Sequence, residues 1–87
     1  MADVSVDDVL SELRRIFKVD LERDEPVELT HDLLRELHVD SLGAIVIAVG
    51  LENRFRVKLT EEDTQGVVTV ADLVGKVAAR INAPPPP

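Results

Sequence analysis

The sequence predicts an all-α protein: a four-helix bundle of three longer helices and one short helix, with a long first loop. Three segments, 6–18, 41–55 and 70–81, repeat apolar residues at the three- and four-residue spacing of one helix face. A residue able to cap a helix N-terminus precedes each segment. No stretch alternates apolar and polar residues long enough to indicate a strand, so a helical bundle is the expected architecture.

The first helix is expected over about 6–18. Ser5 and Asp8 have the spacing of a capping box, in which each side chain accepts a hydrogen bond from the other residue's backbone N–H. The residues that recur at helical spacing are expected in the core: Val6, Val9, Leu10, Leu13, Ile16 and Phe17.

The segment 20–37 has no sustained helical period and contains Pro26, so we expect a long ordered connection there. Long loops of this kind are often functional. Its leucines are expected to pack beneath the core: Leu29, Leu33, Leu34 and Leu37.

The second helix, expected over 41–55, is the most apolar segment, and Asp40 is its expected N-cap. After it, Thr60 and Asp63 are spaced to cap a short third helix that Gly66 stops.

The last helix is expected to run from a capping pair, Thr69 and Asp72, to about Ile81. Its expected core positions are Val70, Leu73, Val74, Val77 and Ile81. The chain ends in "APPPP", which cannot continue a helix, so we expect one domain over 1–82 and a proline-rich tail over 83–87.

Composition narrows the possible partners and surroundings. The chain has 87 residues, enough for one small domain, and contains no cysteine that could form disulfides or bind metal as thiolate. The net charge of −7 and an aromatic content of 2% are unsuited to nucleic-acid binding. The apolar run 44–51 is far shorter than the ~20 residues that span a bilayer. We therefore expect a cytoplasmic monomer that binds neither nucleic acid nor membrane.

The sequence lacks the motifs that serine hydrolysis and calcium binding would need. In "VDSLG", Val39 replaces the first glycine of the hydrolase nucleophile elbow, and no strand precedes the serine. In "DLERDEPVELTH", Glu25 stands where a calcium loop needs glycine, and His31 stands where it needs glutamate. We expect no catalytic residue and no metal site.

Ser41 is the candidate site, because Asp40 as N-cap makes it the first residue of the second helix. The positive end of a helix and its unpaired N–H groups favour an anion there, so a phosphodiester on the Ser41 hydroxyl would be stabilised. Leu42 would seat the helix start against the core. The plain alternative is that Asp-Ser-Leu is only an N-cap followed by a core leucine.

The arrangement as a whole resembles the acyl carrier protein family. The order is a helix, a long loop, "ELHVDSL", a long helix ending in "LENRF", then "VKLTEED" and "VVTVADLV". From Ser41 to Leu73 the family's spacing is met without a gap, and Leu37 stands four residues before the serine as in the family. The resemblance covers about residues 4–82, and His38 departs from it by standing where the family usually has glycine.

The resemblance implies the family's fold and its cofactor. It implies that Ser41, flanked by Asp40 and Leu42, receives a phosphopantetheine arm from coenzyme A. A phosphopantetheinyl transferase would attach the arm, and its thiol would hold an acyl group as a thioester for lipid, fatty acid or polyketide biosynthesis. The implied partners are that transferase, an acyl- or aminoacyl-loading ligase, and biosynthetic enzymes. The protein itself would be a carrier, not an enzyme.

The second helix departs from the family in its exposed face, where carboxylates are usual. One face of this helix is expected to point inward: Ala44, Ile47, Ala48, Leu51 and Phe55. The opposite face is then centred on Val46 and flanked by Gly43, Val49 and Asn53, and Glu52 alone keeps acidic character. We therefore predict a partner surface made of Val46, Val49, Glu52 and Asn53. The alternative is that the first loop or the third helix covers Ile45, Val46 and Val49.

Two other functions stay open from the residues alone. One is an aminoacyl or peptidyl carrier of a nonribosomal-type pathway. The other is an unmodified helical adaptor that binds partners through Val46 and Val49.

Overall fold

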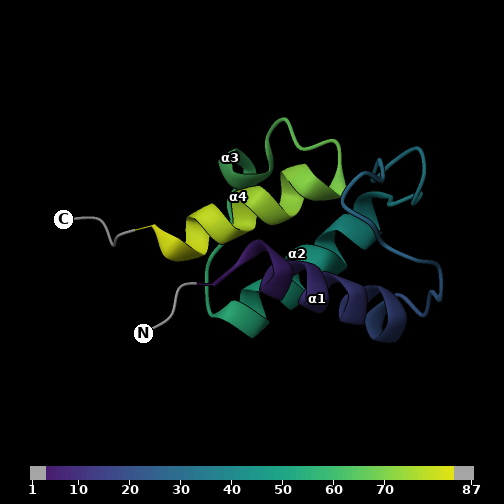
Figure 1. Ribbon diagram of the computed structural model, residues 1–87, viewed down its shortest axis with the longest axis horizontal. Helices are drawn as coiled ribbons and strands as arrows, with labels where there is room; N and C mark the ends of the chain where they lie inside the picture. Colours follow the sequence, from purple (N-terminus) through teal and green to yellow (C-terminus); the bar gives the residue numbers. More distant parts are fainter. Residues whose placement is uncertain (1–3, 84–87) are drawn as a thin grey trace.

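Helices dominate the computed structural model, which describes residues 4–83 (Figure 1). In chain order they are α1 (Val6–Arg15), the π-helical segment η1 (Ile16–Asp20), α2 (Ser41–Phe55), α3 (Glu61–Thr64) and α4 (Val70–Asn82). α1 packs against both α2 and α4, and the short α3 packs against α4. The predicted all-α bundle is confirmed, while the prolines of the expected tail lie outside the described residues.

Side chains cap every α-helix in the way that the sequence predicts. Reciprocal capping boxes join Ser5 to Asp8, Thr60 to Asp63 and Thr69 to Asp72. The backbone hydrogen bonds that each aspartate accepts lower the pKa of its carboxyl below the ordinary value. α2 differs, because its third residue is a glycine and its cap consists of the Asp40 side chain alone.

The first helix departs from the prediction at its C-terminal end. The α-helix expected to about 18 ends at Arg15, and the backbone continues to Asp20 as a π-helical segment. This segment passes close to α2 at Gly50, where a Cβ atom would lie 2.7 Å from Cδ1 of the buried Ile16. Periodicity does not report such a change of helix type, because the apolar residues stay on one side.

The core lies between α1, α2 and α4, with two loop residues, Val27 and Leu37, buried beside it. Leu37 was expected there, but Val27 was missed. Three expected core residues are exposed instead: Val6 (38%), in the first turn of α1, Leu29 (37%) and Leu34 (67%). The core residues are Val9, Leu10, Leu13, Ile16, Phe17, Val27, Leu37, Ile47, Leu51, Val70, Leu73, Val74, Val77 and Ala78.

The other expected core residues are only partly covered. Leu33 and Ile81 are half-buried and pack against the core cluster. The Leu29 side chain is exposed, contrary to the prediction. Its backbone carbonyl accepts a hydrogen bond from the Ala71 N–H at 2.9 Å.

Backbone hydrogen bonds fix the first loop to the chain just before α4. The Leu33 N–H donates to the Val68 carbonyl at 3.0 Å, and the Val70 N–H donates to the His31 carbonyl at 2.9 Å. An isolated antiparallel bridge pairs Asp32 with Thr69 between these bonds. The long loop is therefore ordered as predicted, and Figure 1 shows it at the end of the molecule where α2 and α4 begin.

No helix within residues 4–83 has the length and apolar character needed to cross a membrane.

Candidate functional site

Ser41 is the first residue of α2 and is exposed. Asp40 is the N-cap as predicted: its backbone is extended and its carboxylate accepts a hydrogen bond from the Gly43 N–H at 2.7 Å. The first helical bond runs from the Ala44 N–H to the Asp40 carbonyl at 2.8 Å. The positive end of the helix therefore lies at Ser41, which suits an anion on its hydroxyl.

The turn before α2 is held by a side chain that the sequence analysis missed. His38 has φ 54, a left-handed conformation that costs a non-glycine residue about 1–2 kcal/mol. The Arg23 guanidinium donates to the carbonyls of Leu37 and His38, the latter at 3.2 Å, and pairs with Glu25 at 3.2 Å. Arg23 therefore positions the start of α2 across 14 and 15 residues of sequence, a contact that no local pattern reports.

Leu42 does not seat the helix start against the core. It is 69% exposed, because the second position of α2 lies on the side of the helix away from Ile47 and Leu51. The prediction for this residue is wrong, and the buried residue of the first turn is Gly43, which was expected on the outer side.

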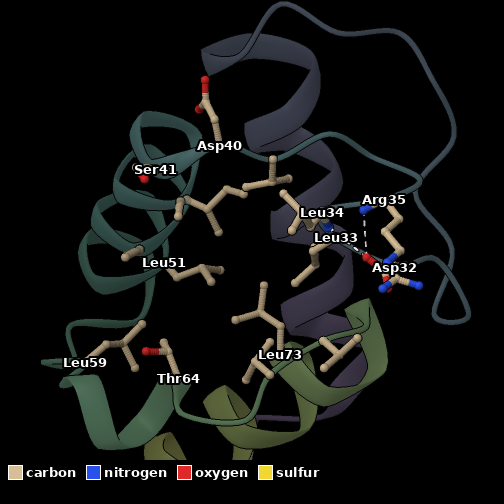
Figure 2. Close-up of a pocket in the computed structure, with 16 residues that line it drawn as sticks. Asp32, Leu33, Leu34, Arg35, Asp40, Ser41, Leu51, Leu59, Thr64 and Leu73 are labelled. Atoms are coloured by element: carbon tan, nitrogen blue, oxygen red, sulfur yellow. Dashed lines mark hydrogen bonds between the residues drawn. The ribbon is translucent and has the colours of Figure 1, made fainter.

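A cavity of about 940 Å³ opens beside Ser41 (Figure 2). Asp40 and Ser41 lie at one end of it and Leu59, Thr64 and Leu73 at the other, while Leu33 and Leu34 of the first loop face Leu51 of α2. The loop leucine expected in the core, Leu34, thus lines the cavity instead. The residues around it are Asp32, Leu33, Leu34, Arg35, Val39, Asp40, Ser41, Ala44, Ile47, Ala48, Leu51, Leu59, Thr64, Val67, Val68 and Leu73.

Most of the cavity wall is apolar, and two of its polar side chains are occupied by other contacts. The Asp32 carboxylate accepts hydrogen bonds from the N–H groups of Leu34 at 2.9 Å and Arg35 at 2.7 Å. The Thr64 hydroxyl donates to the Glu61 carbonyl at 3.2 Å. The cavity thus suits an apolar chain better than a polar one.

The predicted partner surface on α2 is only partly exposed. Val49 is 47% exposed and Asn53 is exposed, but Val46 is half-buried against the core cluster, so the two valines do not share one environment. Glu52 is half-buried, and its carboxylate accepts a hydrogen bond from the Leu59 N–H at 2.7 Å. Of these four residues, Val49 and Asn53 alone are exposed.

The exposed apolar residues of α2 form a face that is shifted by about one residue from the predicted face. Leu42, Ile45 and Val49 recur at helical spacing, and Ile45 is 59% exposed. We call Leu42, Ile45, Val49 and Asn53 the outer face of α2. Helical spacing joins these residues, but the sequence did not reveal this face because α2 is apolar nearly all round.

The two histidines lie in the first loop. Nδ1 of His31 accepts a hydrogen bond from the Glu28 N–H at 3.1 Å, and His38 is exposed. Among the hydrogen bonds described for residues 4–83, none joins the Ser41 hydroxyl to a histidine, and that range contains no group of acidic or histidine side chains arranged to hold a metal ion.

Comparison with known proteins agrees with this geometry. Residues 7–77 match the family model described as the phosphopantetheine attachment site. "Acyl carrier protein 3" of Ralstonia nicotianae is 37% identical over 76 residues, which are 84% of this chain and 85% of that protein. "Acyl carrier protein" of Rhodococcus erythropolis is 34% identical over 73 residues, which are 82% of this chain and 79% of that protein.

A solved structure has the same fold. A candidate acyl carrier protein from Mycobacterium tuberculosis superposes with a TM-score of 0.68 at 26% identity, over 85% of this chain and 95% of that one. The fold and the site define a phosphopantetheine-binding carrier domain. The chain belongs to the acyl carrier protein family.

Family membership establishes the general role. The chain is an acyl carrier for fatty acid or related lipid synthesis, and its cofactor is covalently attached phosphopantetheine. The aminoacyl or peptidyl alternative is not favoured by these matches, and neither is the unmodified adaptor. Carriers of this family work with phosphopantetheinyl transferases and biosynthetic enzymes.

Proposed function

We propose that the Ser41 hydroxyl is the attachment point of the phosphopantetheine arm. The observation that carries this proposal is the position of Ser41, exposed at the first residue of α2 and at one end of an apolar cavity. A phosphodiester there has the positive helix end beside it. The acyl group at the end of the arm also has a cavity within reach.

The attachment is a phosphoryl-type transfer that a separate transferase performs on coenzyme A. The serine oxygen bonds to phosphorus as the pyrophosphate linkage of coenzyme A breaks, and the adenosine bisphosphate half leaves. The serine proton is lost to solvent or to a base of the transferase. Asp40 holds the helix start with its carboxylate on the Gly43 N–H, so its role is to position Ser41.

We further propose that the protein is a carrier and performs no catalysis of its own. Its Ser41 hydroxyl has no histidine among the hydrogen bonds described for residues 4–83 that could act as a base. Tethering the cargo raises its effective concentration at each partner's active site. Residues 1–82 would form this carrier domain, with 83–87 as a tail outside it.

The partners would dock on the outer face of α2. Leu42, Ile45 and Val49 are exposed on the helix that begins at Ser41, so a partner bound there holds its active site near the arm. Glu52 is half-buried, and its carboxylate accepts a hydrogen bond from the Leu59 N–H. We infer that the transferase, the acyl-loading ligase and the later enzymes bind this face through apolar contacts.

Intact-mass measurement tests the attachment site. The purified protein is incubated with coenzyme A and a broad-specificity phosphopantetheinyl transferase. We expect the mass of one phosphopantetheine group to be added to the natural chain and to Ser11→Ala, a matched control that removes an exposed serine from α1. Ser41→Ala should gain nothing. Equal gain in Ser41→Ala would place the arm elsewhere.

A pair of matched substitutions tests the docking surface. Val49→Asp should reduce kcat/KM of the transferase at least several-fold, because it places a charge in the apolar outer face. Val19→Asp changes a somewhat more exposed valine on η1 and should leave kcat/KM nearly unchanged. Equal effects of the two substitutions would show that the outer face is not the docking surface.

A further inference from the structure

One side chain joins the two ends of the first loop just before α2 begins. The guanidinium of Arg23 donates hydrogen bonds to the backbone carbonyls of Leu37 and His38. The backbone of Arg23 is fixed as well, because its N–H donates to the carbonyl of the buried Phe17 at 2.8 Å. Arg23 therefore connects η1 directly to the turn that precedes α2.

This turn contains a backbone conformation that a histidine does not favour. His38 has φ 54, in the left-handed region, and it stands three residues before Ser41. The next residue is also fixed, since the Val39 N–H donates to the Leu33 carbonyl at 2.8 Å. A change of His38 to negative φ would turn the chain in a new direction within three residues of Ser41.

We propose that Arg23 is a positioning residue for attachment of the phosphopantetheine arm. Its guanidinium holds His38 in the left-handed conformation and so keeps Ser41 in the arrangement that the transferase binds. Arg23 acts through the backbone and does not touch coenzyme A or the reacting atoms. This inference rests on the attachment at Ser41 proposed above, and it adds a residue that lies 18 positions away in the sequence.

The physical reason is a shift in population. Without the guanidinium, the left-handed conformation of a histidine is disfavoured by a factor of about 5 to 30. The transferase would then bind only the chains that keep this conformation, so its apparent affinity would fall by the same factor. A bound chain is arranged as before, and the transfer step itself is unchanged. Loss of Arg23 should therefore raise KM and leave kcat nearly the same.

The first experiment measures both constants for the full chain. Coenzyme A and a broad-specificity phosphopantetheinyl transferase are used, the concentration of the carrier is varied, and intact mass reports the product. Arg23→Ala should raise KM about 5- to 30-fold and change kcat by less than about twofold. Arg23→Lys keeps a charged donor and should recover part of the loss. An unchanged KM in Arg23→Ala would overturn the proposal.

A second arginine supplies a matched control. Arg14 of α1 also holds the first loop: its Nε donates to the Val27 carbonyl at 2.9 Å, and it pairs with Glu28 at 3.3 Å. Arg14→Ala should lower Tm about as much as Arg23→Ala does, yet leave KM nearly unchanged. An equal increase of KM in both variants would mean that Arg23 only supports the loop, and would overturn the proposal.

A substitution at His38 tests the link between the two residues. Glycine adopts positive φ without the cost that a side chain imposes. In a His38→Gly background, Arg23→Ala should therefore raise KM by less than about twofold, relative to His38→Gly alone. The full increase in this background would show that Arg23 does not act through the conformation of His38.

The mass measurement separates this inference from the attachment on which it rests. Full mass gain in Ser41→Ala would count against attachment at Ser41. Loading of the natural chain at Ser41, with the same KM in Arg23→Ala, would count against the role of Arg23 alone.

Discussion

The two longest α-helices, α2 and α4, use apolar residues in opposite ways. α4 is amphipathic: Val70, Leu73, Val74, Val77 and Ala78 are buried on one side, and the other side consists of polar residues with the small Ala71 and Ala79. α2 buries only Gly43, Ile47 and Leu51, although nearly all its residues up to Leu51 are apolar. Ala44 and Ala48 line the cavity, whereas Leu42, Ile45 and Val49 lie on the exposed outer face. Val46 and Phe55 are half-buried against the core cluster.

This difference separates a helix that stabilises the fold, α4, from a helix that also forms the functional site, α2. The large apolar side chains of α4 lie on its core face, as expected for a helix whose role is to stabilise the fold. α2 has more than its core face needs, and the excess lies beside Ser41 on both of its free sides. An exposed apolar surface of this kind is typical of a binding site.

The largest expected effect distinguishes the buried side of α2 from its outer face. Leu51→Ala removes a fully buried side chain and should lower the free energy of unfolding by about 2–5 kcal/mol. Ile45→Ala truncates an exposed side chain and should change it by less than about 0.5 kcal/mol. Urea unfolding measures both. Similar losses would mean that the outer face also supports the fold.

A smaller effect compares one glycine in each helix. A Cβ on Gly50 of α2 would lie 2.7 Å from Cδ1 of Ile16, whereas a Cβ on Gly75 of α4 would have nothing within 4 Å. Gly75→Ala should therefore stabilise the protein by about 0.5–1 kcal/mol through helix propensity. Gly50→Ala should destabilise it by about 1 kcal/mol, because overpacking against Ile16 exceeds that gain.

Thermal unfolding of the two alanine variants measures this contrast. A higher Tm in both would show that η1 moves away from α2 at little cost, and that the close approach is not required.

The smallest expected effect concerns the helix caps. The Asp72 carboxylate accepts hydrogen bonds from the N–H groups of Thr69 and Val68, both at 3.1 Å, which lowers its pKa in the folded state. Because the folded pKa lies below the unfolded one, the stabilisation is present above about pH 4 and is lost as the pH falls further. Asp72→Asn should therefore flatten the decline of stability between about pH 4 and pH 2.5.

Urea unfolding over that pH range provides the measurement. Gly43, at the corresponding third position of α2, has no side chain that could contribute in the same way. An unchanged decline in Asp72→Asn would assign the acid sensitivity to other carboxylates, such as Asp8 and Asp63, whose pKa values are lowered by similar caps.

Local sequence signals predicted the helix positions well. The bounds of α2 are 41–55 as expected, and three capping pairs form the bonds that their spacing predicts. The failures concern contacts between distant segments. Leu34 turns to the cavity and not to the core, and Arg23 holds the turn at His38 from the other end of the first loop.

The sequence by itself determined where α2 begins and therefore that Ser41 occupies its first turn, because an N-cap and its helix are settled by neighbouring residues. Tertiary structure alone decided which side of α2 is buried, since a helix that is apolar nearly all round has no preferred face. Packing against Ile16 places Gly50 inward, and the loop between α1 and α2 closes one side of the cavity. What remains exposed, Leu42, Ile45 and Val49, is the part of the apolar helix that its neighbours leave uncovered.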